Sequence, residues 1–162
     1  MLVSVYDMFV SEKKIPYLEE VRTTRCTDDA SVANPSDLVD IMENAFKASR
    51  VAEEHVWMIG LDSQLHCIAV FDVSHGTVNR SAISCAGVLQ RALLSGSSCI
   101  MLAHVHPSGN TDPSEDDIEF TTDIEKACDF CGIRFIDHVI ISGSRRGRYY
   151  SFRESELLHK MC

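Results

Sequence analysis

Two histidines and a carboxylate in the middle of the chain have the types and spacing of a metal site. One residue separates His104 from His106, and Asp117 follows a short segment rich in turn-forming residues. Two imidazoles and one carboxylate leave the fourth position of a tetrahedral zinc ion open to water, which is typical of a catalytic zinc. The same ligand types form the facial triad of non-haem iron oxygenases. We expect zinc, because the setting is strand, loop and helix rather than a β-barrel.

The elements around these residues would bring the three side chains together. Residues 98–103 form an apolar run that predicts a buried strand, and if it continues through the histidines both project from one face. Residues 107–110 end the strand and have turn chemistry. Pro113 is expected to begin a helix with Asp112 as its N-cap. Asp117 would then lie in the first or second turn and reach back to the histidines.

An ordinary structural explanation fits the same spacing. A His-x-His pair is often solvent-facing or simply packed, and a turn before an acidic helix start is normal helix capping. On spacing alone, this alternative and the metal site carry equal weight.

A longer pattern includes a serine. His104, His106, Ser114 and Asp117 fit the order His-x-His, seven residues, Ser, two residues and Asp. This order resembles the metal signature of the JAMM (MPN+) metalloproteases, and the surrounding sequence is similar to the RadC branch of that superfamily. Val105 departs from the branch, which usually has Asn there, and we expect Val105 to point away from the metal. The similarity runs from about Ser36 to Phe152 and includes Leu102 to Gly109, Pro113-Ser114, Glu54 before Val56-Trp57, Leu61-Asp62, Gly76-Thr77-Val78-Asn79 and Asp137-His138.

The resemblance implies a role for each polar residue of this pattern. It implies one zinc ion per chain, held by the two histidines and Asp117, and a glutamate that handles protons for the metal-bound water. Glu54 matches that position, although Glu53 and Glu54 also suit the solvated end of a helix. Ser114 is implied to donate a hydrogen bond to a developing oxyanion, and capping of the helix start is the alternative for its hydroxyl.

The order of predicted elements indicates an α/β fold with a mixed sheet flanked by helices. The resemblance implies a JAB/MPN-like, cytidine-deaminase-like architecture of three layers. We expect residues 1–162 to form one domain with its core at about 36–152, without a helix-hairpin-helix segment, and the first thirty residues to be tail-like. Strands are expected at about residues 4–9, 20–25, 55–61, 65–72, 98–106, 133–141 and 149–152, and helices at about 34–46, 86–94, 114–131 and 154–158.

Other chemistry-bearing residues are expected to be structural. Trp57 suits the core, and the Cys128-x-x-Cys131 pair is expected to be incidental rather than a redox or metal site. His138 follows Asp137, and because Asp-His pairs often orient groups around metals it suits an outer contact to the site. An ordinary structural role is the favoured alternative for His138. The other histidines, His55, His66, His75 and His159, are expected to be exposed or satisfied polar groups.

Composition and charge restrict the class of protein and its partners. With 45% hydrophobic and 24% charged residues the chain is globular, and no apolar run approaches a membrane span. Seven scattered cysteines and the absence of a signal peptide favour a reducing cytoplasm. The net charge of -9 argues against nucleic acid as substrate, since only residues 145–148 form a basic cluster. A local patch can override net charge, and the sequence does not fix the oligomeric state.

Three functions follow from these observations. The leading hypothesis is a zinc-dependent metallopeptidase or isopeptidase that acts on a peptide or protein with a metal-activated water and Glu54 as general base. The alternatives are a RadC-type protein in DNA repair or nucleic-acid processing, and a metal-binding regulatory module with little turnover. The complete set of polar residues argues against the regulatory module.

Overall fold

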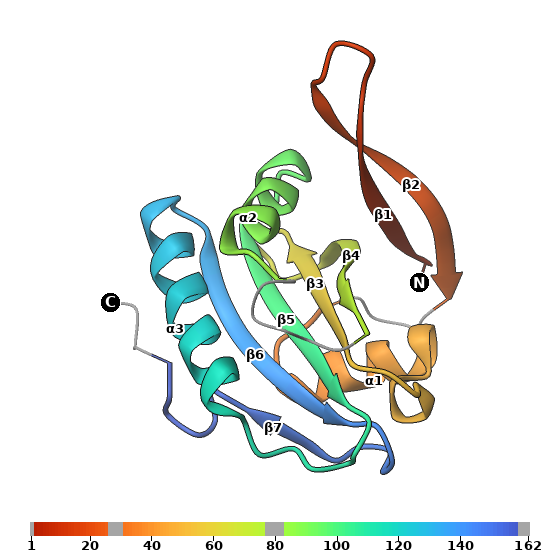
Figure 1. The fold of residues 1–162 in the computed structure, drawn as a ribbon, viewed down its shortest axis with the longest axis vertical. Helices are drawn as coiled ribbons and strands as arrows, with labels where there is room; N and C mark the ends of the chain where they lie inside the picture. The colour runs from red at the N-terminus through yellow and green to blue at the C-terminus, as the bar shows by residue number, and fades with distance from the viewer. Residues whose placement is uncertain (1, 26–30, 77–82, 159–162) are drawn as a thin grey trace.

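The structure is a computed structural model that describes residues 2–25, 31–76 and 83–158. In this part of the chain, seven strands form one mixed sheet. The strand order is β2-β1-β4-β3-β5-β6-β7 (Figure 1). The helices are α1 (Pro35–Phe46), α2 (Cys85–Leu94) and α3 (Glu115–Phe130), with one 3₁₀ turn, η1 (Ala48–Arg50). The strands are β1 (Leu2–Val10), β2 (Pro16–Arg25), β3 (His55–Leu61), β4 (Cys67–His75), β5 (Cys99–His106), β6 (Arg134–Ser142) and β7 (Tyr149–Ser151).

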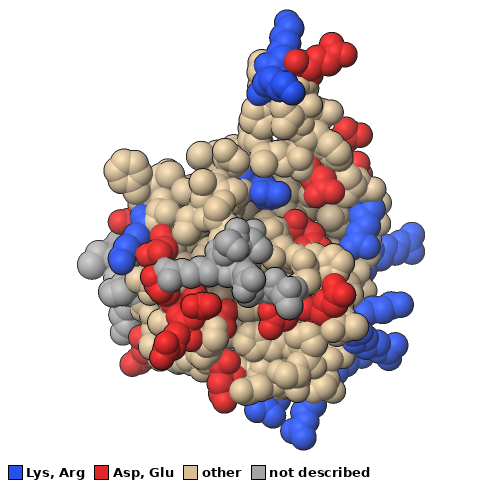
Figure 2. All heavy atoms as spheres, in the orientation of Figure 1, with Lys and Arg blue, Asp and Glu red and all other residues tan. Residues whose placement is uncertain are grey.

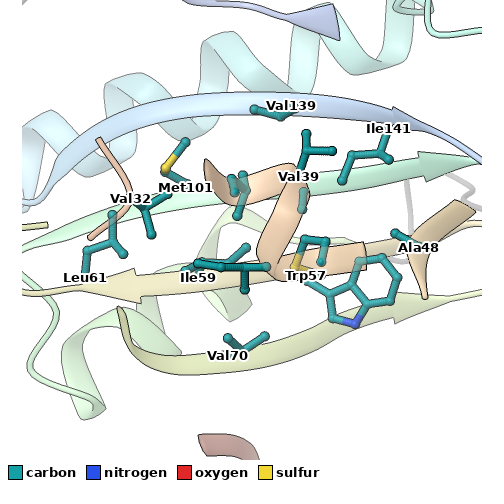
Figure 3. Packing of buried hydrophobic residues seen from close by; sticks show 14 of the residues in the cluster. Val32, Val39, Ala48, Trp57, Ile59, Leu61, Val70, Met101, Val139 and Ile141 are labelled. Carbon is teal, nitrogen blue, oxygen red and sulfur yellow. The ribbon is translucent and has the colours of Figure 1, made fainter. Parts of the chain in front are cut away.

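Helices cover both faces of the sheet, α1 on one face and α2 and α3 on the other (Figure 1). The side chains of β5 explain this arrangement, because Met101 and Ala103 pack with α1 whereas Ile100 and Leu102 pack with α2 and α3. Figure 3 shows the α1 side, where Trp57 lies among the aliphatic side chains of the core. The expected α/β fold with a mixed sheet between helices is confirmed, and so is the core position of Trp57.

The central strand β5 runs antiparallel to β3 and parallel to β6. Its register places His104 beside Val56 and Ile140, and Leu102 beside His138. Residues in register on neighbouring strands point to the same face, so His138 shares the α3 side of the sheet with His104. The topology thus gathers side chains from several strands beneath the start of α3.

The first two strands form a long hairpin that projects from the body of the protein (Figure 1). The sequence predicted two short strands and a tail-like segment here, and the tail-like character is wrong. Pairing extends from Leu2 with Arg25 to Val10 with Pro16, and Val5 also pairs with Val70 of β4. Because β2 is exposed on both faces, it lacks the apolar alternation that identifies a half-buried strand.

Two expected helix boundaries also differ from the structure. The N-cap of α3 is Ser114 rather than Asp112, because the Ser114 hydroxyl accepts the hydrogen bond of the Asp117 amide. The short closing helix expected at 154–158 is instead a series of turns, in which Glu156 adopts a left-handed conformation with φ of 57°. None of the helices in the described residues is long and apolar enough to cross a membrane.

Candidate metal centre

The two histidines at the end of β5 lie on one face of the sheet, as their spacing predicted. His104 is 3% exposed, whereas His106 is partly exposed at the end of the strand. Their rings meet edge to face with centroids 4.5 Å apart. Neither side chain is simply solvent-facing, so that part of the structural alternative does not apply.

The following turn fixes which nitrogen of His106 carries a proton. His106 Nδ1 lies 2.9 Å from the main-chain oxygen of Asn110. A carbonyl oxygen only accepts, so Nδ1 donates and Nε2 keeps its lone pair. The turn depends on Gly109, which has a φ of 81° and donates its amide hydrogen to the His106 carbonyl. Nε2 of His106 is therefore available as a metal ligand, in the arrangement common for metal-binding histidines.

The helix start of α3 holds the carboxylate of Asp117 towards both histidines. The carboxylate is part of a capping box. Asp117 Oδ2 accepts one hydrogen bond of 2.8 Å from the Ser114 main-chain nitrogen and one of 2.6 Å from the Ser114 hydroxyl. Asp117 Oδ1 lies 3.0 Å from His104 Nδ1, and Oδ2 lies 3.6 Å from His106 Nε2. Burial alone would raise the pKa of Asp117, but its interactions with His104 and His106 outweigh burial and hold the pKa well below its usual range.

His104 provides the observation that best tests whether a metal fits. Both of its ring nitrogens are buried and neither has a hydrogen-bond partner. Nδ1 is 3.0 Å from Asp117 Oδ1, yet the two atoms are not aligned as a hydrogen bond. A buried polar atom without a partner is costly, and a cation shared by the imidazoles and the carboxylate would satisfy it. The two-nitrogen, one-oxygen donor set suits a divalent transition metal.

Two adjacent glutamates before β3 take different positions. Ligand atoms of Glu54, His104 and His106 all lie within 4.8 Å of one another, a grouping that could hold a metal ion. Glu53 instead contacts His75, whose Nε2 lies 3.0 Å from Glu53 Oε2. The structure therefore brings Glu54, but not Glu53, together with the histidines. A hydrogen bond from the Gly76 amide to the Glu54 carbonyl holds the main chain of Glu54 in place.

A cavity of about 160 Å³ joins these residues. One part of its wall is apolar and another part is acidic. Among the described residues that line it, none is a lysine or an arginine. Sequence reasoning missed the apolar wall, because single apolar residues on separate elements give no local pattern. The lining residues are Glu54, Val56, Ile83, His104, His106, Ser114, Asp116, Asp117, Phe120 and His138.

His138 belongs to the site, but not through the neighbour that the sequence suggested. Its Nδ1 lies 2.7 Å from the hydroxyl oxygen of Thr121 on α3. Asp137 faces the opposite side of β6, where it accepts hydrogen bonds from the Ser151 hydroxyl and the Arg153 amide. Consecutive residues of a strand alternate between faces, so Asp137 takes no part in the outer contact that the sequence suggested for His138. Burial, mainly, lowers the pKa of His138 to about 3, which keeps the ring neutral.

The remaining candidates have structural surroundings in the described part of the chain. His55, His66 and His75 each lie within 3.3 Å of a carboxylate oxygen, from Asp72, Asp62 and Glu53 respectively. Cys128 is buried, which raises the pKa of its thiol to about 12, while Cys131 is exposed at the end of α3. His159 lies outside the described residues.

Comparison with known proteins identifies the family of this chain. A family model described as a RadC-like JAB domain matches residues 32–157. The UPF0758 protein LL1007 of Lactococcus lactis subsp. lactis (strain IL1403) is 40% identical over 113 residues, which cover 70% of this chain and 49% of the relative. The UPF0758 protein of Actinobacillus pleuropneumoniae serotype 5b (strain L20) is 38% identical over 113 residues, covering 68% and 50%. This chain spans about half the length of these curated relatives, and it belongs to the RadC-like JAB domain family.

Proposed function

We propose that this chain is a zinc-dependent peptidase or isopeptidase that hydrolyses an amide bond with a metal-activated water. The observation that carries the proposal is that both buried ring nitrogens of His104, which lie beside the Asp117 carboxylate and Glu54, make no hydrogen bond. Membership of the RadC-like JAB domain family supports a metal-dependent hydrolase or a RadC-type role. The finer assignment to zinc and to amide hydrolysis rests on the chemistry of the donor set.

Three side chains would hold the metal: His104, His106 and Asp117. The Asn110 carbonyl keeps the Nε2 lone pair of His106 available, and the Ser114 amide and hydroxyl both donate to the Asp117 carboxylate. When bound, zinc polarises a carbonyl group and lowers the pKa of its water from that of bulk water to about 7.

The protein's own residues then handle the protons of the reaction. Glu54 takes one proton from the attacking water while the water oxygen bonds to the carbonyl carbon. As the carbon–nitrogen bond breaks, Glu54 returns that proton to the leaving amine. The Ser114 hydroxyl, which donates to Asp117 Oδ2, would turn to donate to the oxyanion, so its capping and catalytic roles are compatible.

The surface around the site supports a peptide rather than a nucleic acid as substrate. Val56, Ile83 and Phe120 line the cavity and offer contacts to an apolar side chain. Asp116 adds an acidic group to the lining, and no lysine or arginine among the described lining residues would bind phosphate. Acidic side chains gather over the middle of the face in Figure 2, whereas basic side chains lie mainly towards its rim.

Metal content is the experiment that tests this proposal first. Wild-type protein and His104→Ala, both purified without added metal, are compared by elemental analysis. His66→Ala is the matched control, because His66 contacts Asp62 in a turn outside the cavity lining. We expect near-stoichiometric zinc in wild type and His66→Ala and none in His104→Ala, followed by cleavage of peptide or isopeptide substrates.

Two other results would redirect the proposal. Iron in place of zinc would favour oxygenase chemistry at the same three ligands. Zinc binding without hydrolysis of any amide substrate, by wild type or by protein reloaded with zinc, would favour a metal-binding regulatory module.

A further inference from the structure

One buried histidine borders the cavity without belonging to the metal-ligand set. His138 on β6 is 1% exposed, and its ring lies nearly parallel to those of His104 and Phe152, with centroids 5.8 Å and 4.9 Å away. Thr121 on α3 contacts its Nδ1. These contacts hold the ring plane in place, so the direction of its second nitrogen is fixed.

The hydrogen bonds of Thr121 determine which nitrogen of His138 carries the proton. The Thr121 hydroxyl oxygen lies 2.5 Å from the Asp117 carbonyl oxygen and 2.7 Å from His138 Nδ1. The hydroxyl has one hydrogen, and the carbonyl oxygen can only accept, so the hydroxyl donates to Asp117. His138 Nδ1 must then donate to the hydroxyl oxygen. The neutral ring therefore carries its proton on Nδ1 and has a lone pair on Nε2.

That lone pair has no donor from the described residues. His138 Nε2 is buried and makes no hydrogen bond, although His138 lines the cavity together with Glu54 and His104. The Ser114 hydroxyl, which also lines the cavity, already donates to Asp117. A buried acceptor is normally satisfied by ordered water when protein offers no donor. The cavity of about 160 Å³ has room for several waters, each with about 30 Å³ of liquid volume.

We infer that His138 Nε2 accepts a hydrogen bond from the water that attacks the substrate, while Glu54 accepts the other hydrogen of the same water. No bond to His138 forms or breaks, and its ring stays neutral throughout. Two acceptors would orient the water so that a lone pair, rather than an O–H bond, faces the carbonyl carbon. This role rests on the proposed hydrolytic function, and the residue that sets the tautomer, Thr121, lies one helical turn beyond Asp117.

Nuclear magnetic resonance of the protein labelled with ¹⁵N-histidine tests the inference without any activity assay. In metal-free wild type we expect His138 to show the Nδ1–H tautomer, and Thr121→Val to lose this fixed preference. In the zinc-loaded protein we expect nuclear Overhauser contacts between the ring protons beside Nε2 and a bound water. An Nε2–H tautomer in wild type, or no water contact in the zinc-loaded protein, would overturn the inference.

Cadmium distinguishes a water acceptor from a direct metal ligand. In protein loaded with ¹¹³Cd, scalar coupling to the metal is expected for ring nitrogens of His104 and His106 and not for His138. Coupling between ¹¹³Cd and His138 Nε2 would make His138 a ligand and refute its role in holding water.

Kinetics then measure what the hydrogen bond contributes. His138→Phe should keep its zinc and its KM and lose about tenfold in kcat, the size of one hydrogen bond. His138→Gln should recover part of the loss, because its amide oxygen can accept, and it remains informative where the Phe variant fails to fold. Unchanged kcat in both variants would contradict the inference. If wild type itself hydrolyses nothing, the proposed function fails and the catalytic role of His138 fails with it, whereas a missing water contact at Nε2 in an active enzyme refutes the role of His138 alone.

Discussion

At the residue scale, the neighbours Glu53 and Glu54 provide a test of the general base. Glu54 lies with the histidines, whereas Glu53 pairs with His75. We expect Glu54→Gln to keep bound zinc and to lose about 100-fold or more in kcat, since an amide cannot take the proton of the attacking water. The measurement combines elemental analysis with steady-state kinetics on the best peptide substrate.

The matched control for this substitution is Glu53→Gln. It makes the same chemical change one residue away, where the carboxylate is exposed, and should leave kcat within about twofold of wild type. Equal rates for Glu54→Gln and wild type would remove Glu54 from the mechanism. Equal losses in both variants would indicate disturbance of the segment before β3 rather than loss of a base.

At the element scale, the start of α3 combines helix capping with metal binding. Ser114 caps the helix and donates to the Asp117 carboxylate, whereas Ser84 caps α2 by accepting from the Gly87 amide. Replacing either serine with alanine should lower the free energy of unfolding by about 1 kcal/mol in the metal-free protein. Only Ser114→Ala should also weaken zinc affinity, because only that cap orients a ligand.

Denaturant unfolding and competition with a zinc chelator measure these two effects separately. A loss of stability in both variants with a loss of zinc affinity in Ser114→Ala alone is the expected result. Weakened zinc binding in Ser84→Ala as well would mean that general stability, rather than the orientation of Asp117, controls affinity. Unchanged affinity in Ser114→Ala would show that Asp117 holds its position without the cap.

The same elements show how far the sequence predicts the structure. The near-continuous apolar run of β5 and the His-x-His spacing were sufficient to predict a buried strand with both histidines on one face, because those signals are local. The roles of Thr121 and Phe120 were not predictable, since they depend on which turn of α3 lies over β6. The hairpin of β1 and β2 was underestimated, because exposure on both faces removes the alternating pattern.

At the scale of the whole molecule, charge separates hydrolysis of a peptide from a role in nucleic-acid processing. The chain has a net charge of -9, and the run Arg145-Arg146-Gly147-Arg148 lies in an exposed turn that joins β6 to β7. Counterion release makes non-specific DNA binding depend on several clustered cations, with dissociation constants of about 10⁻⁴ to 10⁻⁶ M at physiological salt. This chain should bind more weakly than that range.

Fluorescence anisotropy with labelled single-stranded and duplex DNA tests this prediction. The salt concentration is varied between 50 and 200 mM, roughly the range over which such binding is lost. We expect no saturable binding at the upper salt concentration. We also expect the triple variant Arg145→Ala, Arg146→Ala and Arg148→Ala to keep wild-type peptidase rates, because the cavity lining contains none of these residues. Tight binding that falls steeply with salt and disappears in the triple variant would instead support nucleic-acid processing. In that case the acidic cavity and the basic turn would serve different ligands, because a site lined by Asp116 and Asp117 repels phosphate.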